Sequence, residues 1–328
     1  MPDKPSFISP KVRWLGLVDA GLFIGLAASW LGLLGSWHWL LDLCSHFRWQ
    51  GTLVCLVALA WAGWQGRRWV MRAALLTLLL NAGWWARPGP SAPSGYPAPD
   101  FGVKIISFNI LTTNQNHAGV LSWLQQADAD IIFLMEVDRV WAKALQPLLT
   151  THPYHLIQPR SDNFGLALYS RLAPEKMVVL DSAALQSGGF SEPDLCMDSI
   201  ECRFKTGGRG WIFLGTHPVP PMGGAYAAAR DWQLEALSQH IARAGLPVLL
   251  AGDLNASPWS HAFRQLTRAT SLRPAPGAWI PTWRVGSLFA LPIDHALCSP
   301  PLIFKTRIIG PDLGSDHRPQ LIEVGWAS

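Results

Sequence analysis

The sequence predicts a mixed α/β domain that follows a transmembrane helical region. Three observations predict this arrangement. Residues 1–86 are almost uncharged and rich in Leu, Ala, Gly and Trp, residues 87–100 are rich in Pro, Gly and Ser, and residues 101–328 alternate between strand and helix signals. We therefore divide the chain into a membrane region, a semi-rigid linker and a globular domain.

The membrane region is expected to contain three spans. Residues 14–34 are long enough to cross a bilayer, whereas residues 49–66 and 69–86 are shorter and contain polar side chains. Ten of the 18 tryptophans lie before residue 87, and tryptophan gathers at membrane interfaces because its ring is apolar and its N–H needs a polar partner. The apolar stretch is too long for a secretory signal peptide and shows no clear cleavage site.

The positions of Lys and Arg predict the orientation of these spans. The basic residues before the first span and around the turn between the second and third are Lys4, Lys11, Arg13, Arg67, Arg68 and Arg72. In the loop at residues 35–48, Arg48 is the only Lys or Arg. By the positive-inside rule the N-terminus is cytoplasmic, and three spans then place the globular domain in the periplasm of a bacterial inner-membrane protein.

The globular domain has no basic excess. Residues 101–328 contain 18 basic and 18 acidic side chains, so the formal net charge of +4 belongs to residues 1–100. This balance argues against nucleic-acid binding driven by net charge alone, although a local basic patch stays open. The five cysteines do not form the pattern of a disulfide framework.

Hydrophobic patterns predict the elements of the globular domain. Apolar runs predict strands at residues 103–111, 130–137, 165–171, 211–217 and 246–252. Apolar residues at helical spacing predict helices at residues 117–129 and 225–243. Several of the strands are apolar throughout, so we expect sheets that are covered on their outer faces.

Polar side chains stand at the ends of three of these strands. Asn109 and Glu136 each follow an apolar run, and an amide and a carboxylate oxygen suit Mg²⁺, which takes few protein ligands and keeps several waters. A strand-end acid that faces solvent is the alternative for Glu136. Asp253 and Asn255 are two apart, so both face the same way on an extended segment. A plain turn is the alternative for this pair.

These segments occur in a recognisable order along the chain. They are Ser107-Phe108-Asn109, Met135-Glu136, Thr216-His217-Pro218, Gly252-Asp253-Leu254-Asn255, Ile293-Asp294-His295 and Ser315-Asp316-His317-Arg318-Pro319. In this order they resemble the endonuclease/exonuclease/phosphatase superfamily, which includes deoxyribonucleases, abasic-site endonucleases, inositol phosphatases and sphingomyelinases. The resemblance covers roughly residues 101–326. It implies a four-layer sandwich of two mixed β-sheets flanked by helices, and hydrolysis of a phosphoester with Mg²⁺ or Mn²⁺.

The resemblance also implies roles for individual residues. The expected metal ligands are Asn109, Glu136 and Asp316, the expected catalytic residues are His217, Asp253, Asn255, Asp294 and His317, and the expected substrate-binding residues are Asn163 and Arg230. Asp253 would activate water, Asn255 would hold the phosphate, and His317 paired with Asp294 would contact the scissile phosphate. A solvated helix face is the alternative for Arg230.

Two positions refine the resemblance. His217 is similar to the histidine of the deoxyribonuclease, sphingomyelinase and inositol phosphatase branches, whereas abasic-site endonucleases carry Tyr there. Met135 stands where the family often has Gln. We interpret His295 as structural, because its side chain should point away from that of Asp294.

Two classes of function remain open from the sequence. One is a membrane-anchored phosphoester hydrolase whose substrate is a lipid-linked or small phosphoester, or alternatively DNA or RNA. The other is a catalytically inactive binding module on the same fold. The expected partners are the phosphoester and the lipid bilayer, and no protein partner is indicated.

Overall fold

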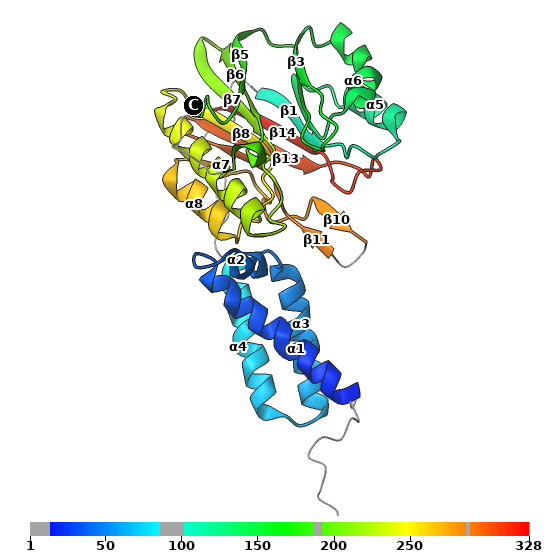
Figure 1. Cartoon of the computed structure of the whole chain (residues 1–328), viewed down its shortest axis with the longest axis vertical. Coiled ribbons are helices and arrows are strands. Elements are labelled where there is room, and N and C mark those ends of the chain that lie inside the picture. The colour runs from blue at the N-terminus through cyan, green and yellow to red at the C-terminus, as the bar shows by residue number, and fades with distance from the viewer. Residues whose placement is uncertain (1–13, 86–101, 186–191, 287–288, 328) are drawn as a thin grey trace, which may run out of the picture. The chain divides into compact units, whose positions relative to one another are not determined.

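The computed structural model describes residues 14–85, 102–185, 192–286 and 289–327, and the chain separates into two compact units, Met1–Arg87 and Pro88–Ser328 (Figure 1). The predicted linker at residues 87–100 lies outside the described residues. Lys4, Lys11 and Arg13, which entered the prediction of topology, also lie outside them.

The N-terminal unit is helical. Its α-helices are α1 (Trp14–Leu31), α2 (Trp39–Ser45), α3 (Arg48–Trp64) and α4 (Arg68–Trp85). In the described part of the chain, one helical stretch, Gly16–Leu34, is long and apolar enough to cross a membrane. Helix α3 has 17 residues, about 26 Å at 1.5 Å per residue, which is short of a hydrocarbon core of about 30 Å. Helix α4 includes Arg68, Arg72 and Asn81. The expectation of three spans is therefore not supported by helix length and composition.

The interior of the helical unit combines a small apolar cluster with buried polar side chains. Arg48 is 1% exposed and donates from Nη1 to the Ser29 carbonyl at 2.8 Å and to Asn81 Oδ1 at 3.0 Å. Asn81 and Cys55 are fully buried beside it. Large apolar side chains instead face outward on all three long helices: Phe23, Ile24, Leu53, Leu56, Val57, Leu75, Leu76 and Leu79.

The C-terminal unit contains two six-stranded sheets in its described residues. The first is built from β1 (Gly102–Asn109), β2 (Ile131–Met135), β3 (Tyr154–Gln158), β4 (Leu166–Ser170), β13 (Leu302–Ile309) and β14 (Gln320–Trp326). The second is built from β5 (Pro174–Leu180), β6 (Ser199–Thr206), β7 (Arg209–Thr216), β8 (Val248–Asp253), β9 (Arg273–Pro274) and β12 (Asp294–Cys298). A separate hairpin joins β10 (Trp283–Val285) to β11 (Phe289–Leu291).

Both sheets are mixed. Their strand orders are β13-β14-β1-β2-β4-β3 and β5-β6-β7-β8-β12-β9. In the first sheet β1 and β2 are parallel, and in the second β7 and β8 are parallel, while the other neighbouring strands are antiparallel. In each sheet the parallel pair is central, so the strand ends that carry polar residues lie in the middle of a sheet.

Helices cover the outer face of each sheet. They are α5 (His117–Gln126), α6 (Arg139–Ala144), α7 (Gly224–Arg243) and α8 (His261–Ala269). Val120 and Trp141 pack on the first sheet, and Leu237 and Phe263 pack on the second. Between the sheets lies a shared apolar core, in which the rings of Phe133 and Phe213 meet edge to face at 5.7 Å. Figure 1 shows α7 and α8 together on one side and α5 and α6 on the other.

This architecture confirms the predicted α/β fold of two mixed sheets flanked by helices. Each predicted strand and helix of the globular domain overlaps an observed element, with ends that differ by a few residues. The sequence patterns did not predict the short helices α6 and α8, the strands β3, β5, β6, β9, β13 and β14, or the β10–β11 hairpin. All five cysteines are free thiols, as expected from the absence of a disulfide pattern.

Two glycines hold the backbone where the polar strand ends meet. A Cβ atom on Gly165 would lie 1.9 Å from the Val137 carbonyl oxygen, next to Glu136. Gly252 has φ +149°, and a Cβ there would lie 1.9 Å from the Thr216 carbonyl oxygen. Close backbone contact therefore requires glycine immediately before Asp253.

Replacing Gly252 with alanine should lower the free energy of unfolding by about 2 kcal/mol or more, because the new methyl group would separate β7 from β8. Urea denaturation of the purified full-length protein in detergent, followed by tryptophan fluorescence, measures the change. Gly207→Ala is the matched control, since Gly207 also has a positive φ but has no atom near its Cβ position. Equal losses in the two variants would contradict the prediction.

Candidate functional site

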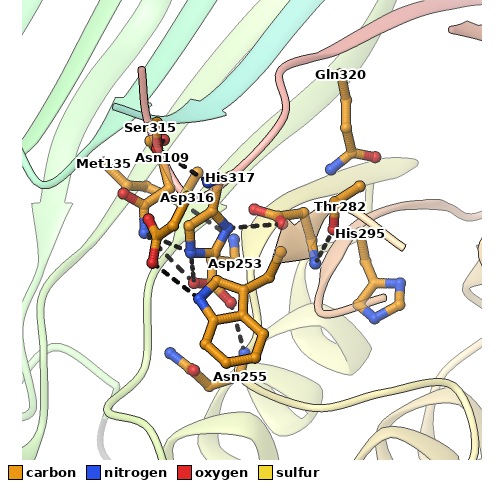
Figure 2. Close-up of polar contacts among 12 residues, drawn as sticks. Asn109, Met135, Asp253, Asn255, Thr282, His295, Ser315, Asp316, His317 and Gln320 are labelled. Atoms are coloured by element: carbon orange, nitrogen blue, oxygen red, sulfur yellow. Dashed lines mark hydrogen bonds and ion pairs between the residues drawn. The ribbon is translucent and has the colours of Figure 1, made fainter. Parts of the chain in front are cut away.

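The expected site residues converge where the two sheets meet at one edge. Asn109 ends β1, Glu136 follows β2, Asp253 ends β8 and Asp294 begins β12. Asp294 pairs with Asp253 in the second sheet, and Asn109 pairs with Met135 in the first. Figure 2 shows Asn109, Asp253 and His317 directed toward one another.

Asn109 and Glu136 are in direct contact. Asn109 Nδ2 donates to Glu136 Oε1 at 2.8 Å, and the Leu111 N–H donates to Asn109 Oδ1 at 3.1 Å. Glu136 Oε2 accepts the N–H of Thr112 at 3.2 Å. The Asn109 amide therefore presents its nitrogen to Glu136, and a metal-ligand role for its oxygen would require the amide to turn over.

The carboxylate of Asp253 lies at the centre of the cluster. Its Oδ1 accepts the Asn255 N–H at 2.9 Å, which holds the turn after β8. Its Oδ2 lies 3.5 Å from His217 Nε2, 3.5 Å from His317 Nε2 and 3.4 Å from Asn109 Nδ2. Three segments that are distant in the sequence thus share one buried oxygen.

His317 is oriented by Asp294. Its Nδ1 lies 2.8 Å from Asp294 Oδ2, which leaves Nε2 facing Asp253 and Asn109. Ser315 holds the same segment, because its hydroxyl donates to the Asn109 carbonyl at 2.8 Å and accepts the His317 N–H at 3.0 Å. The expected pairing of Asp294 with His317 is present in this geometry.

Burial and charge set the protonation of the cluster. Burial opposes the charged imidazole of His317, but the carboxylates of Asp294 and Asp253 outweigh it and raise the pKa of His317 to about 10. Burial also opposes ionisation of Asp253, but His317 and His217 outweigh it and lower the pKa of that carboxyl. Burial raises the pKa of Asp294. At neutral pH a cationic imidazole therefore stands beside the Asp253 carboxylate.

Asp316 is held by the β10–β11 hairpin. Its Oδ2 accepts the indole N–H of Trp283 at 2.9 Å, and its backbone carbonyl accepts the N–H of Arg284 at 2.8 Å. Its Oδ1 is buried and accepts no hydrogen bond from the described residues. Buried carboxylate oxygens usually accept a hydrogen bond, so this oxygen is open to a further partner.

The two expected substrate-binding residues differ in exposure. Asn163 is exposed, with φ 68°, on the loop where the next residue, Phe164, packs its ring 5.2 Å from that of His217. Arg230 is 1% exposed and donates from Nη1 to the Asn255 carbonyl at 3.0 Å. Arg230 thus holds the turn after β8, and a direct contact with substrate stays a prediction.

Asn255 and His295 have partners outside the cluster. The Asn255 side chain donates to the Pro218 carbonyl at 2.9 Å, which ties its turn to the segment after His217. His295 Nε2 bonds the Ala256 carbonyl at 2.8 Å, and burial lowers the pKa of His295 to about 3. The interpretation of His295 as structural agrees with this position.

Acidic and histidine side chains in the cluster form a possible metal site. Asp253, Asp294 and His317 offer ligand atoms within 4.8 Å of one another. Both carboxylates already contact the His317 imidazole, so a cation among the three groups would have to displace a proton from His317. The carboxylates of Glu136 and Asp316 provide hard oxygen ligands beside them. One oxygen of Asp316 accepts no hydrogen bond from the described residues. The residues present therefore fit a divalent cation that prefers oxygen ligands.

Some contacts of the site had no signal in the sequence. Ser315 belongs to a segment that the sequence singled out, but Thr112 and Thr282 do not. Thr282 accepts the Asp294 N–H through its hydroxyl at 3.3 Å. Such contacts depend on the fold of the hairpin and loops, and no spacing rule along the chain identifies them.

Comparisons with known proteins agree with the two-sheet fold. A model of the Endonuclease/Exonuclease/phosphatase family matches residues 106–317. No curated protein matches the chain. Among solved structures, the endonuclease/exonuclease/phosphatase from Bacteroides vulgatus is 18% identical with a TM-score of 0.58, covering 69% of this chain and 100% of that one.

Two further solved structures have a similar fold. One is D. rerio TDP2 complexed with single strand DNA product, which is 15% identical with a TM-score of 0.55 and covers 69% of this chain and 100% of that one. The other is the human Nocturnin catalytic domain with bound sulfate, which is 19% identical with a TM-score of 0.54 and covers 69% of this chain and 94% of that one. At these identities the likeness is one of fold.

Proposed function

Because this chain belongs to the Endonuclease/Exonuclease/phosphatase family, whose members are typically phosphoester hydrolases or nucleases, we propose that it hydrolyses phosphoester bonds with the help of Mg²⁺. The observation that carries the proposal is the convergence of Glu136, Asp253 and His317 from separate strand ends. Mn²⁺ is the alternative cation, since it also binds oxygen ligands.

The residues of the cluster would divide the reaction between them. The cationic His317, oriented by Asp294, would stabilise negative charge on a phosphoryl oxygen, and the Asp253 carboxylate would orient and deprotonate the attacking water. His217 would assist from the other side of Asp253. Glu136 and Asp316 would hold the cation, which supplies positive charge to the developing phosphorane oxygens when bound.

We further propose that the N-terminal unit is embedded in the bacterial inner membrane and passes through it more than once. The outward apolar side chains of α1, α3 and α4 support this, because a soluble unit rarely exposes so many large apolar side chains. The small and polar interior around Arg48 and Asn81 also supports it, since membrane helices pack through such residues. With three spans the catalytic unit would face the periplasm.

We propose a membrane-associated phosphoester as the substrate. Anchoring supports this choice, since it would keep the catalytic unit near lipid headgroups. The balanced charge of residues 101–328 also supports it, because nonspecific DNA binding depends on neutralised phosphates. A nuclease is the second candidate, and the fold shared with a TDP2 solved with a DNA product favours it.

Purified full-length protein in detergent should release phosphate or headgroup from mixed phospholipid micelles when Mg²⁺ is present. This hydrolysis should stop when EDTA is added in excess. The reason is that Glu136 and Asp316 would hold a cation that stabilises charge during the reaction. Phosphate and headgroup release are measured beside nicking of plasmid DNA at moderate salt. Asp253→Ala is the control for contaminating enzymes.

Each outcome of this panel decides between the candidates. Rapid nicking of plasmid that Asp253→Ala abolishes, with no release from lipid, would show a nuclease. Turnover that persists unchanged in EDTA would overturn the proposed role of the cation. A protein inactive on every substrate, with all metals tested, would favour the binding module.

Asp294→Asn should lower turnover by roughly a hundredfold or more with little change in KM, because the amide no longer stabilises a charged His317 in the required orientation. Initial rates across a range of substrate concentrations give kcat and KM separately. Glu201→Gln is the matched control, since it removes another buried carboxylate paired with a histidine, His240, at 2.6 Å. A similar fall in both variants would assign the loss to folding.

Reporters fused after Ser328 should show a periplasmic C-terminus, because basic residues favour a cytoplasmic N-terminus and three spans would carry the chain across the membrane. An alkaline phosphatase fusion should be active and a green fluorescent protein fusion dark. The opposite pair of signals would place the catalytic unit in the cytoplasm and would mean that an even number of segments crosses.

A further inference from the structure

The β10–β11 hairpin is attached to the segment that carries Asp316 and His317. Trp283 forms an antiparallel bridge with His317. The Arg284 N–H donates to the Asp316 carbonyl at 2.8 Å, and the Arg318 N–H donates to the Thr282 carbonyl at 2.8 Å. Residues 282–284 therefore pair with residues 316–318 as well as with β11. This pairing fixes the backbone position of Asp316.

The indole of Trp283 then fixes the Asp316 carboxylate itself. Its Nε1–H donates to Oδ2 at 2.9 Å, whereas Oδ1 is buried and accepts no hydrogen bond from the described residues. A carboxylate that is held by one oxygen has little freedom to rotate. The hydrogen bond from Trp283 therefore also determines the direction of Oδ1.

Asp316 is connected through Ser315 to the site of Asn109 and Glu136. Ser315, the residue before it, donates its hydroxyl to the carbonyl of Asn109, whose side chain contacts Glu136. The free oxygen thus belongs to a segment tied to the Glu136 carboxylate. Leaving a buried carboxylate oxygen without a donor is costly, and a bound cation removes that cost.

We propose that Trp283 is a positioning residue, which holds Asp316 so that Oδ1 is available to a divalent cation shared with Glu136. The inference rests on the proposed metal-dependent hydrolysis and deepens it. It gives the hairpin a role in metal affinity, whereas an indole that only packs would affect stability alone. Groups that orient a metal ligand commonly contribute ten- to a hundredfold to affinity.

Trp283→Phe tests the inference, because it keeps an aromatic ring and removes the N–H donor. Mn²⁺ titration of the full-length protein in detergent, followed by electron paramagnetic resonance, should show binding weakened by about tenfold or more. The KM for the phosphoester at saturating metal should stay within about twofold, since the indole does not bind substrate in this account. Trp279→Phe, a change of the same type at a half-exposed tryptophan, should bind Mn²⁺ as wild type does.

A second variant keeps the test independent of folding. Asp316→Asn retains an acceptor for the indole and removes the charge, so it should lose Mn²⁺ affinity while its thermal unfolding midpoint stays near that of wild type. Adding Trp283→Phe to it should weaken binding little further, because the two residues act as one unit. Fully additive losses in the double variant would overturn the inference.

The outcomes separate this inference from the proposed function. A Trp283→Phe protein that binds Mn²⁺ as tightly as wild type and still hydrolyses phosphoesters would overturn the inference alone. A wild-type protein that binds Mn²⁺ in a Trp283-dependent manner but hydrolyses nothing would overturn the proposed function alone. Absence of Mn²⁺ binding by the wild-type protein would overturn the inference directly.

Discussion

The buried carboxylate of Asp253 is the group on which the arrangement of the site depends. Its side chain is 2% exposed, and a charge so far from water is stable only when donors surround it. Those donors are His217 after β7, His317 before β14 and Asn109 at the end of β1. Asp253 belongs to the second sheet and Asn109 to the first. The packing of the two sheets and the assembly of the cluster therefore require the same alignment, so a shift of either sheet would leave a buried charge without partners.

The backbone around the cluster adopts unfavourable conformations where these groups are brought together. Among the described residues that are not glycine, five have positive φ, and three of them are the expected site residues Glu136, Asn163 and Asn255. Such conformations cost about 1–3 kcal/mol each and persist where the surrounding structure enforces them. The Thr112 hydroxyl donates to the Glu136 backbone carbonyl, which supports one of these conformations. The Asp253 carboxylate accepts the Asn255 N–H, which supports another. The turns after β2 and β8 are therefore shaped for the position of their side chains rather than for an easy chain reversal.

The sequence predicts those elements and site residues whose structure is determined by neighbouring residues in the chain, and it does not predict contacts that form only after folding. Strands such as β2 and β8 are buried on both faces, so their continuous apolar runs identify them and the polar residues that end them. Strand β5 is an edge strand with a mixed pattern, and β10 has only three residues, so neither has a clear signal. The hydrogen bond from Trp283 to Asp316 joins residues 33 apart and depends on the folded hairpin. The three expected spans rested on apolar composition, whereas one helical stretch of the described chain meets the length and hydropathy of a span.

A hydrolase and a binding module that has lost activity differ in their need for buried charges. Replacing buried charges with apolar residues of similar size often leaves a protein as stable or makes it more stable. A module that only bound a partner would have no need to keep Asp253 and Asp294 buried beside a cationic His317, at the strand ends where the resemblance to a hydrolase family expects them. Asp316 has a buried oxygen with no donor in the described chain. Under the proposed hydrolysis a divalent cation would satisfy that oxygen and a phosphoryl group would accept from the imidazole, whereas a binding module would leave both features unexplained.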